Sequence, residues 1–499
     1  MSELLSLDDY RGVAAELQIP DSAYIDGGYH RCGGDPLVTT NPADGAVLAT
    51  IQMADEADVD MAVQKAREAF DCGAWSRLHP AERKAVLIRL AKLVKRNRHQ
   101  LAVLEAMDSG KPVSDCASID IPEVINTIIW HAEAIDKIYD DTAPVGSDAL
   151  ALVVREPIGV VAAVLPWNFP LLMLAWKLGP ALAAGNCLIA KPAEQTPLSA
   201  LYLARLAGDA GLPRGVFQVL PGDGPTTGQA LGRHADIDMV SFTGSTETGR
   251  RFLAYAAESN LKKVTLECGG KNPAIVMDDA EDLDSVAEHI AMGAFWNLGQ
   301  NCSATSRLIV HEAVKDDLLE RLGQHIKEWR QGEPLDPVNR LGTLIDADHT
   351  AKVRSYLDKA VDEGLAPVAG TLSDIICPVI FEVADAASVL ANEEVFGPVL
   401  AVIPVKSIDE AVQIANRTDY GLAASLFTSN VKNAMRAARD MRAGTVTVNA
   451  YGEGDITTPF GGYKQSGFGG RDNGLAAHDQ FTEIKTIWVD LSDRRPDAM

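Results

Sequence analysis

The chain has 499 residues, of which 47% are hydrophobic, 23% are charged and 6% are aromatic. This length and composition are typical of a folded protein of about two to four domains and exclude a disordered or fibrous chain. With 45 basic and 69 acidic residues the formal net charge is −24, so the molecule repels polyanions, and nucleic acid and anionic membranes are poor partners.

The N-terminal part is expected to be helical. Apolar residues recur at helical spacing in 58–70 and 80–107, and Pro80 stands where a first-turn proline belongs. No basic region followed by an apolar stretch is visible at the start, so no secretory signal is expected. The seven cysteines are scattered and lack CxxC spacing, which predicts a reduced, cytoplasmic protein without disulfides or a structural metal.

The segment 157–190 has Lys177 as its only charge and raises the question of a membrane span. Prolines and glycines interrupt it at short intervals and leave no continuous apolar stretch of about 18 residues. A buried strand, a loop and a core helix near 170–184 are the better interpretation.

From Gly159 onward, short β-rich runs alternate with helical segments. Strands are expected at 159–165, 186–191, 216–222 and 239–244, with helices near 170–184, 197–210, 225–232 and 246–258. This alternation predicts a parallel, doubly wound sheet. A second α/β domain is expected to follow, with helices near 283–297, 312–330 and 408–416. The segments 135–155 and from 481 onward are strand-like, and each is either an exposed edge or an arm that pairs with another subunit.

Two glycine-rich turns and an acidic turn indicate a nucleotide site. Gly224 and Gly228 lie in LPGDGPTTGQAL, and Gly244 and Gly249 lie in SFTGSTETGR. Glycines there let backbone N–H groups approach a phosphate, although an ordinary turn between a strand and a helix looks the same. Glu194 in AKPAEQTP could accept ribose hydroxyls and disfavour a 2′-phosphate, or be a solvated turn residue.

Cys302 in LGQNCSATSR is a candidate nucleophile. A lone cysteine is more often a small buried hydrophobic residue. A nucleophile would need a base and an oxyanion donor, for which Glu267 in TLECGG and Asn168 in PWNFP are the candidates. The spacing of these residues does not decide whether they meet.

Six longer motifs are PWNFP at 166–170, FTGSTETG at 242–249, LECGGKNP at 266–273, GQNCSATSR at 299–307, NEEVFGPV at 392–399 and PFGGYKQSG at 459–467. In order and spacing they resemble the aldehyde dehydrogenase superfamily over nearly the whole chain. The resemblance implies an α/β fold with a Rossmann-like doubly wound cofactor domain, an α/β catalytic domain and a small β oligomerisation arm. These domains would span 1–134 with 154–266, then 267–464, and 135–153 with 480–499.

The resemblance also implies a role for each matching residue. Cys302 matches the nucleophile and Glu267 the general base, while Asn168 and the Cys302 backbone N–H match the oxyanion hole. Lys177 matches a residue on a proton path. A thioester on Cys302 must be hydrolysed, so the carboxylate of Glu267 argues against a coenzyme-A-acylating enzyme.

The implied cofactor is NAD, with NADP as the alternative and no metal. Lys191 and Glu194 match adenosine-ribose contacts, and Glu394 and Phe396 match contacts on the nicotinamide side. The other residues expected at the cofactor are Leu165, Trp167, Gly224, Phe242, Ser245 and Gly249.

Within the superfamily, the segments 120–141 and 154–186 and the closing FTEIKTIW look most similar to bacterial enzymes for γ-glutamyl-γ-aminobutyraldehyde, guanidinobutyraldehyde and related ω-amino aldehydes of polyamine breakdown. Asp120 and Glu123 could attract a cation at the tunnel mouth, or be an N-cap and a first-turn acid. Phe169, Trp176 and Tyr451 could line the tunnel and hold a cation, or pack in the core. Asn301 is a further candidate substrate contact.

Alternatives to this function remain. The substrate could instead be a betaine-type aldehyde, a semialdehyde or a general aliphatic aldehyde. More remote are a non-catalytic NAD-binding scaffold and a cysteine hydrolase. The partners expected are a small aldehyde and further copies of the chain, in a dimer or tetramer.

Two segments depart from the family pattern. SGFGGRD carries one residue more than the usual SGxGRE, so no contact is assigned to Arg471 or Asp472. The segment around 370–378 is shorter than usual, which indicates a trimmed surface loop without an assigned function.

Overall fold

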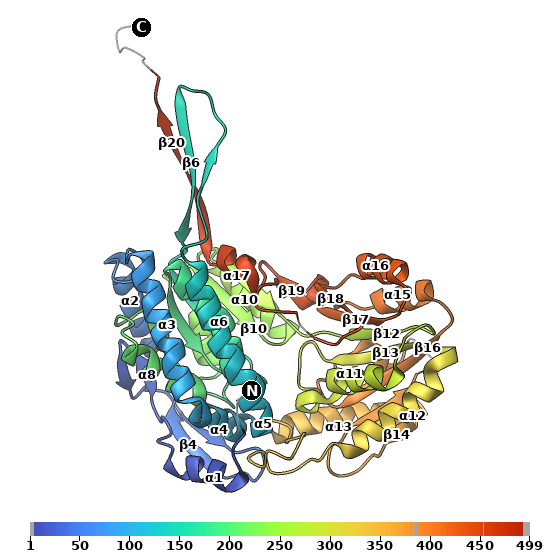
Figure 1. Ribbon diagram of the computed structural model, residues 1–499. Helices are drawn as coiled ribbons and strands as arrows, with labels where there is room; N and C mark the ends of the chain where they lie inside the picture. Colours follow the sequence, from blue (N-terminus) through green and yellow to red (C-terminus); the bar gives the residue numbers. More distant parts are fainter. Residues whose placement is uncertain (1–3, 384–386, 453, 493–499) are drawn as a thin grey trace.

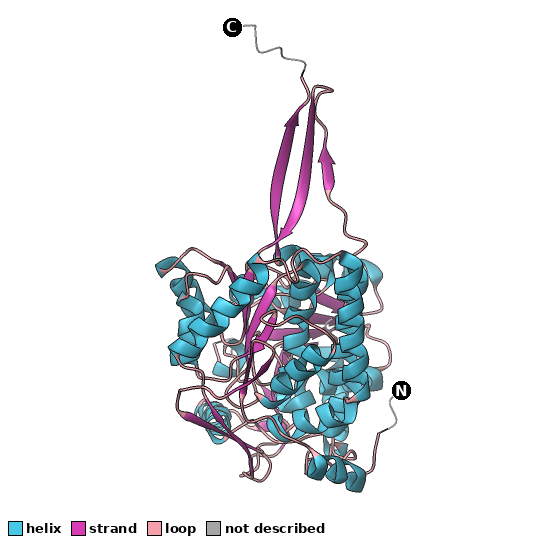
Figure 2. Ribbon diagram, turned by 90° about the vertical axis from the view of Figure 1, so that its left-hand side faces the viewer, coloured by secondary structure: helices cyan, strands magenta, loops and turns pink. Residues whose placement is uncertain are grey.

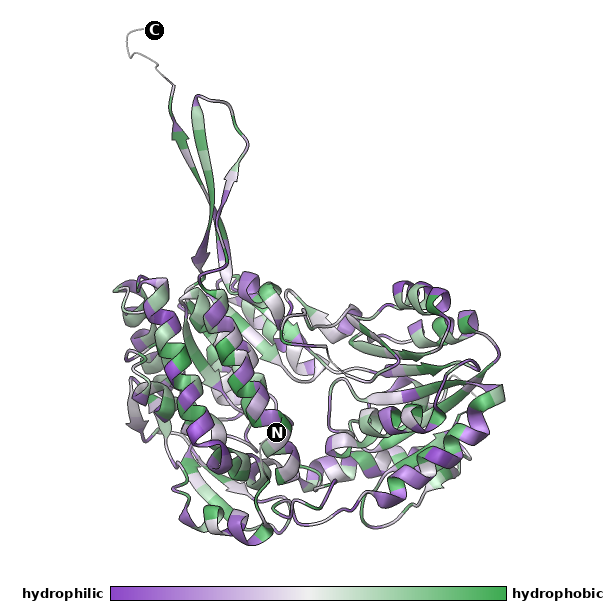
Figure 3. Cartoon of the chain, viewed as in Figure 1, coloured by the Kyte–Doolittle hydropathy of each residue, from purple (hydrophilic) through white to green (hydrophobic). Residues whose placement is uncertain are grey.

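The computed structural model describes residues 4–383, 387–452 and 454–492. The strands of these residues form sheets of eight, seven, three and two strands (Figures 1 and 2). Helices cover the two large sheets, whose strands are mostly hydrophobic, whereas the outer helices also carry many hydrophilic residues (Figure 3). The predicted α/β fold is confirmed.

The eight-stranded sheet is doubly wound. Its members are β7 (Val160–Val164), β8 (Cys187–Lys191), β9 (Phe217–Val219), β10 (Met239–Thr243) and β11 (Lys263–Glu267), all parallel, with antiparallel β1 (Ala23–Ile25), β2 (Gly28–His30) and β19 (Gly467–Phe468) at the edges. The parallel strands lie in the order β11, β10, β7, β8, β9. The chain therefore leaves the central β7 in one direction and returns to β10 on the other side. Ligands bind such sheets at the carboxyl ends of the strands, where the direction switches.

The segment 157–190 is a buried strand, loop and helix, as predicted. Helix α7 (Pro170–Ala184) begins at a proline and ends before Gly185, which adopts φ +104°. Every residue of α7 is buried, because α3 (Pro80–Arg96) and α6 (Ile121–Ala134) pack beside it. Within the described part of the chain, no helix combines the length and the apolar character that a membrane crossing requires.

Three expectations for this half of the chain were incomplete. The predicted helix 80–107 is two helices, α3 and α4 (Arg98–Ser109), because Asn97 leaves helical geometry and its side chain binds Leu93 O. The predicted helix 225–232 begins as a π-helical turn, Gly224–Gly228. The N-terminal part also contains strands, including the hairpin β3 (Pro36–Thr40) and β4 (Val47–Gln52).

The remaining helices of this half include several whose ends carry clear signals. Ser245 caps α10 by accepting a hydrogen bond from Thr248 N, and Asp55 and Asp58 form a capping box at the start of α2. The helices are α1 (Leu7–Glu16), α2 (Glu56–Asp71), α5 (Val113–Asp115), α8 (Leu198–Asp209), α9 (Gln229–Arg233), α10 (Thr246–Glu258) and α17 (Gly474–Gln480).

The seven-stranded sheet forms the predicted second α/β domain. Its members are β12 (Asn272–Val276), β13 (Thr305–His311), β15 (Val379–Glu382), β16 (Val399–Val405), β17 (Ala423–Phe427) and β18 (Thr445–Val448), all parallel, with antiparallel β14 (Pro367–Gly370) at one edge. Its helices are α11 (Leu283–Phe295), α12 (Glu312–Glu328), α13 (Ala347–Asp362), α14 (Val389–Asn392), α15 (Ile408–Asn416) and α16 (Val431–Asp440).

Alternation along the strands gives this sheet a core on each face. Ala274 and Val276 pack in the cluster under α11 and α12, whereas Ile275 between them packs under α15 and α16. The shortened segment 371–378 is the connection between β14 and β15.

The two strand-like segments pair with each other. β6 (Ala149–Pro157) and β20 (Thr482–Asp490) are antiparallel along their whole length, and β5 (Asp141–Ala143) adds a third strand. The three strands project from the body of the molecule (Figures 1 and 2). Ile484 and Trp488 are 71% and 61% exposed. Residues 493–499 of the predicted arm lie outside the described part.

Candidate active site

The three candidate catalytic residues line one cavity of about 210 Å³. Asn168 lies in the loop after β7, Glu267 ends β11, and Cys302 lies in the loop before β13 of the second sheet. The strand ends β7 and β11 share the carboxyl edge of the first sheet, and the loop of Cys302 approaches from the second. The fold therefore brings together residues that are far apart in the sequence.

The loop that carries Cys302 is held in an unusual conformation. Asn297, Leu298 and Gly299 all adopt positive φ, at 51°, 53° and 68°. Asn168 Nδ2 donates a hydrogen bond to Gln300 O at 3.0 Å, and Asn297 Nδ2 donates to the same oxygen at 3.2 Å. These bonds hold the Asn168 amide beside the backbone that leads to Cys302.

Glu267 is buried at the end of β11. Burial raises its pKa well above the usual range, and the nearby carboxylate of Asp472 raises it further. The positive charges of Lys177 and Arg471 oppose these effects. A carboxylate with a raised pKa is a stronger base, which suits the activation of water near neutral pH.

The sequence pattern left Asp472 without a role, yet Asp472 lines the catalytic cavity. Its carboxylate lies 3.3 Å from Lys177 Nζ and accepts a hydrogen bond from Gln480 Nε2 at 3.0 Å. Two backbone hydrogen bonds with Phe460 fix its position. Gly469, three residues earlier in the chain, adopts φ +80°, which few other residues would take.

The expected cofactor residues lie along the carboxyl edge of the first sheet. Lys191 ends β8 and lies 3.3 Å from Glu194 Oε1, while Ser245 caps α10 and lines the cavity. Such a row of strand ends and helix N-termini fits a dinucleotide. Gly224 opens the π-helical turn near Lys191. Leu165, Phe242 and Gly249 are buried in the sheet and the first turn of α10 and line neither of the cavities described here.

The residues expected on the nicotinamide side, Glu394 and Phe396, lie in the second domain. Glu394 accepts a hydrogen bond from Gly270 N at 2.8 Å, and the rings of Trp167 and Phe396 meet edge to face at 5.4 Å. His349 and Lys352 of α13 line the same cavity, although no motif singled them out. In the described residues, no group of three or more His, Cys, Asp or Glu side chains could hold a metal ion.

A second cavity of about 240 Å³ neighbours the first, and Trp176 lines both. Glu123, Trp296, Tyr451 and Asp455 also line this second cavity. Asn301 does not line it. Instead, its side chain donates a hydrogen bond to the hydroxyl of Tyr451 at 3.0 Å.

Two expected substrate contacts are placed elsewhere. Asp120 is fully buried and forms an ion pair with Lys111, so its carboxylate does not reach the tunnel mouth, and it makes no N-cap hydrogen bond either. Phe169 lines neither cavity. The ammonium of Lys111 lies 3.8 Å from the centre of its ring, so this aromatic face already holds a cation of the protein itself.

Comparison with known proteins decides the family. A model of the aldehyde dehydrogenase family matches residues 31–487. The chain belongs to this family. It is therefore an oxidoreductase that acts on aldehydes with a nicotinamide cofactor, as the resemblance implied.

Similar aldehyde dehydrogenases come from bacteria. An aminoacetaldehyde dehydrogenase from Pseudomonas aeruginosa is 58% identical over 99% of this chain and 100% of its own length. The NADP/NAD-dependent aldehyde dehydrogenase PuuC from Escherichia coli is 47% identical over 96% of this chain and 97% of its own. A crystal structure of indole-3-acetaldehyde dehydrogenase with NAD+ is 46% identical, covers 98% and 100% of the two chains, and superposes with a TM-score of 0.96.

Proposed function

We propose that this aldehyde dehydrogenase oxidises small aldehydes that carry a cationic amine, with NAD, to the carboxylic acids. The observation that carries the proposal is the second cavity, which adjoins the cavity of Cys302 at Trp176 and is lined by Glu123 and three aromatic side chains. A carboxylate and aromatic faces both attract an ammonium group. The similarity to an aminoacetaldehyde dehydrogenase supports the same substrate class.

In the proposed reaction, the Cys302 thiolate attacks the aldehyde carbon. The resulting alkoxide is stabilised by the Asn168 amide, whose second N–H is free of the bond to Gln300, and by the Cys302 backbone N–H. Collapse of the alkoxide to the thioester releases the hydride from the former aldehyde carbon, and bound NAD would supply the acceptor. The residues along the edge of the first sheet, with Glu394 and Phe396, would hold it.

Hydrolysis of the thioester then returns Cys302 to its thiolate. Glu267 takes a proton from the attacking water, the C–S bond breaks and the carboxylic acid leaves. Lys177 and Asp472, which lie 3.3 Å apart beside Glu267, are positioned to lead this proton away from the cavity.

Preference for NAD over NADP is proposed to rest on Glu194. Its carboxylate stands at the end of β8 beside Lys191, where a ribose would bind. A 2′-phosphate there would meet a like charge.

The arm is proposed to join copies of the chain into a dimer or tetramer. Ile484 and Trp488 expose apolar surface on β20, which a monomer would leave in water. The division into cofactor domain (1–134 and 154–266), catalytic domain (267–464) and arm (135–153 and 480–499) is part of this proposal. The seven cysteines, none of which is in a disulfide in the described structure, agree with a reducing, cytoplasmic location.

A neutral aromatic aldehyde is the second candidate, because Trp176, Trp296 and Tyr451 also offer apolar contact. NADH formation with matched aldehydes separates the two. We expect kcat/KM for 4-aminobutanal and 3-aminopropanal to exceed that for pentanal, butanal, phenylacetaldehyde and succinic semialdehyde.

Replacement of Glu123 by Gln tests the residue that carries the proposal. The variant should lower kcat/KM for 4-aminobutanal by about fivefold, the scale of a partly screened ion pair, and leave pentanal unchanged. Glu133→Gln, on the same helix but away from the cavity, is the control. Equal losses for both aldehydes, or a preference of the parent enzyme for neutral aldehydes, would overturn the cationic substrate class.

A further inference from the structure

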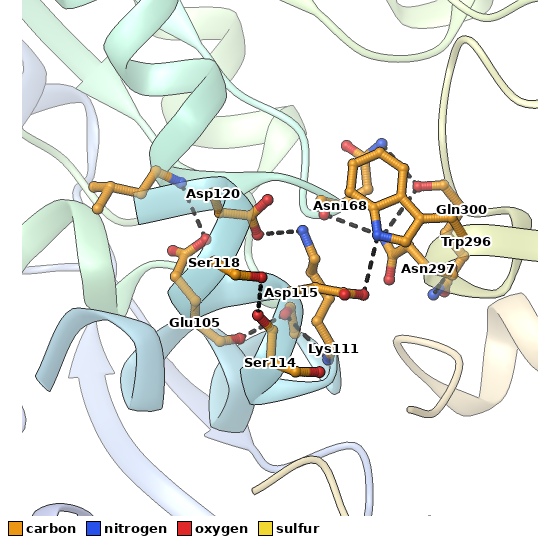
Figure 4. A network of polar contacts seen from close by, with 12 residues as sticks. Glu105, Lys111, Ser114, Asp115, Ser118, Asp120, Asn168, Trp296, Asn297 and Gln300 are labelled. Atoms are coloured by element: carbon orange, nitrogen blue, oxygen red, sulfur yellow. Dashed lines mark hydrogen bonds and ion pairs between the residues drawn. The ribbon is translucent and has the colours of Figure 1, made fainter. Parts of the chain in front are cut away.

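A buried polar network lies beside the loop that carries Asn168 (Figure 4). At its centre is the ion pair between Lys111, in the loop after α4, and Asp120, at the start of α6. Both side chains are almost fully buried, and neither lines the two cavities. The reaction described above does not use them, so the burial of two charges here calls for another explanation.

The ammonium of Lys111 also contacts two aromatic rings. It lies 3.8 Å from the centre of the Phe169 ring and 5.8 Å from that of Trp296. The two rings pack against each other with their centres 5.2 Å apart. Trp296 is fixed further by a hydrogen bond from Nε1 to Asp115 Oδ2 at 3.0 Å. The charge of Lys111 therefore holds both rings by cation–π attraction.

These rings belong to the two segments that form the proposed oxyanion hole. Phe169 follows Asn168 directly, and Trp296 opens the turn that continues through Asn297 to Cys302. Asn297 Nδ2 donates to Asn168 O at 3.3 Å, and Figure 4 shows this contact beside Trp296 and Lys111. The left-handed conformation of Asn297 is costly, so contacts around it must hold it in place.

We propose that Lys111 is a positioning residue for the oxyanion hole: held by Asp120, its ammonium clamps Phe169 and Trp296 and so keeps the Asn168 amide directed at the substrate oxygen. The inference rests on the proposed role of Asn168 and concerns how that role is maintained. Burial lowers the pKa of Lys111, but the charge and hydrogen bond of Asp120, together with Cys116 and Glu105, outweigh burial and the net shift is upward, so the clamp stays charged.

The test removes both charges together, because removing one would leave the other buried and unpaired. The double variant Lys111→Met/Asp120→Asn is compared with the parent enzyme and with Lys84→Met/Asp136→Asn. The latter breaks an ion pair of 2.9 Å on the surface of the same helical layer and serves as control. The rate of the first NADH turnover, KM and NAD affinity are measured for each.

We expect the first turnover of the Lys111/Asp120 variant to slow by about 10- to 100-fold, with KM and NAD affinity within about twofold, because a small misplacement of a catalytic group has effects of that size. The same changes are then made in an Asn168→Ala background. There, the loss of the clamp should cost nothing further, since it acts through the missing amide. The control variant Lys84→Met/Asp136→Asn should leave the rate of the first turnover unchanged in either background.

Phe169→Leu gives a second measurement if the double variant does not fold. It removes the ring but leaves the ion pair. It should slow the first turnover when Asn168 is present and have no further effect in the Asn168→Ala background. Equal losses in both backgrounds, an unchanged first turnover, or a rise in KM alone would overturn the inference and leave the role of Asn168 standing. If Asn168→Ala itself has no effect, the proposed oxyanion hole is wrong and the clamp has no purpose.

Discussion

The ammonium of Lys177 lies 3.3 Å from a carboxylate oxygen of Asp472, and both side chains are buried. Both charges act on Glu267. The carboxylate of Asp472 raises the pKa of Glu267, and the ammonium of Lys177 lowers it. The pair therefore sets the pH range in which Glu267 is available as a base, and each member acts in the opposite direction.

Asp472→Asn should move the acid limb of the kcat profile to lower pH. The change removes a like charge and leaves Lys177 facing Glu267, so the pKa of Glu267 falls and the base stays deprotonated in more acidic solution. Lys177→Met should move the limb to higher pH. A shift of about one unit either way corresponds to about 1.4 kcal/mol.

The profile is measured as steady-state kcat against pH for both variants. Asp479→Asn, which removes an exposed carboxylate nearby, should leave it unchanged. Shifts of Asp472→Asn and Lys177→Met in the same direction would show that this pair does not control Glu267.

Cys302→Ala should abolish aldehyde oxidation while NAD still binds. Glu267→Gln should form the thioester but hydrolyse it slowly, because the amide cannot take a proton from water. Rapid mixing should then show a burst of about one NADH per site, followed by turnover that is slower than in the parent enzyme by about 100-fold. Steady turnover in Cys302→Ala would remove the proposed nucleophile.

Glu194→Gln should relax cofactor selection. Without the negative charge beside Lys191, a 2′-phosphate meets no repulsion, so kcat/KM for NADP should rise by about tenfold while that for NAD falls slightly. The measurement is the ratio of the two kcat/KM values. An unchanged ratio would mean that another residue selects the cofactor.

Ile484→Lys/Trp488→Lys should shift the enzyme toward monomers. The substitutions place two charges on the exposed apolar surface of β20, where an interface would have to bury them at a cost of several kcal/mol. Light scattering after gel filtration gives the mass of each species. Val361→Lys, at an exposed apolar position on α13, is the control. An unchanged mass would place the subunit interface elsewhere.

Local signals in the sequence predicted much of the fold. Helices α7, α10 and α15 begin and end where they were expected, because Pro170, Ser245 and Ser407 mark their starts and Gly185 follows the end of α7. The candidate catalytic residues were chosen from motifs. The sequence alone did not predict that these residues line one cavity, because this depends on which strand ends share an edge of the sheet.

The contacts of charged residues were harder to predict. Helical spacing placed Asp120 and Glu123 together, but Asp120 is drawn into the core by Lys111, which lies on another segment. Phe169 packs against the same cation and lines neither cavity. Asp472 was missed because its motif, SGFGGRD, carries one residue more than the family pattern. Gly469 in this motif adopts a positive φ of 80°. Phe169 and Asp472 each contact a lysine that is distant in the sequence, Lys111 and Lys177.

The pairing of β6 with β20 also determines when the arm can form during synthesis. Thr482 to Asp490 are made long after their partners Ala149 to Pro157. The strands of both large sheets precede β20 in the sequence and can fold first, because domains fold as units from the N-terminus. β6 therefore pairs with β20 only after both large sheets have been made, and any assembly through the arm cannot begin before that point.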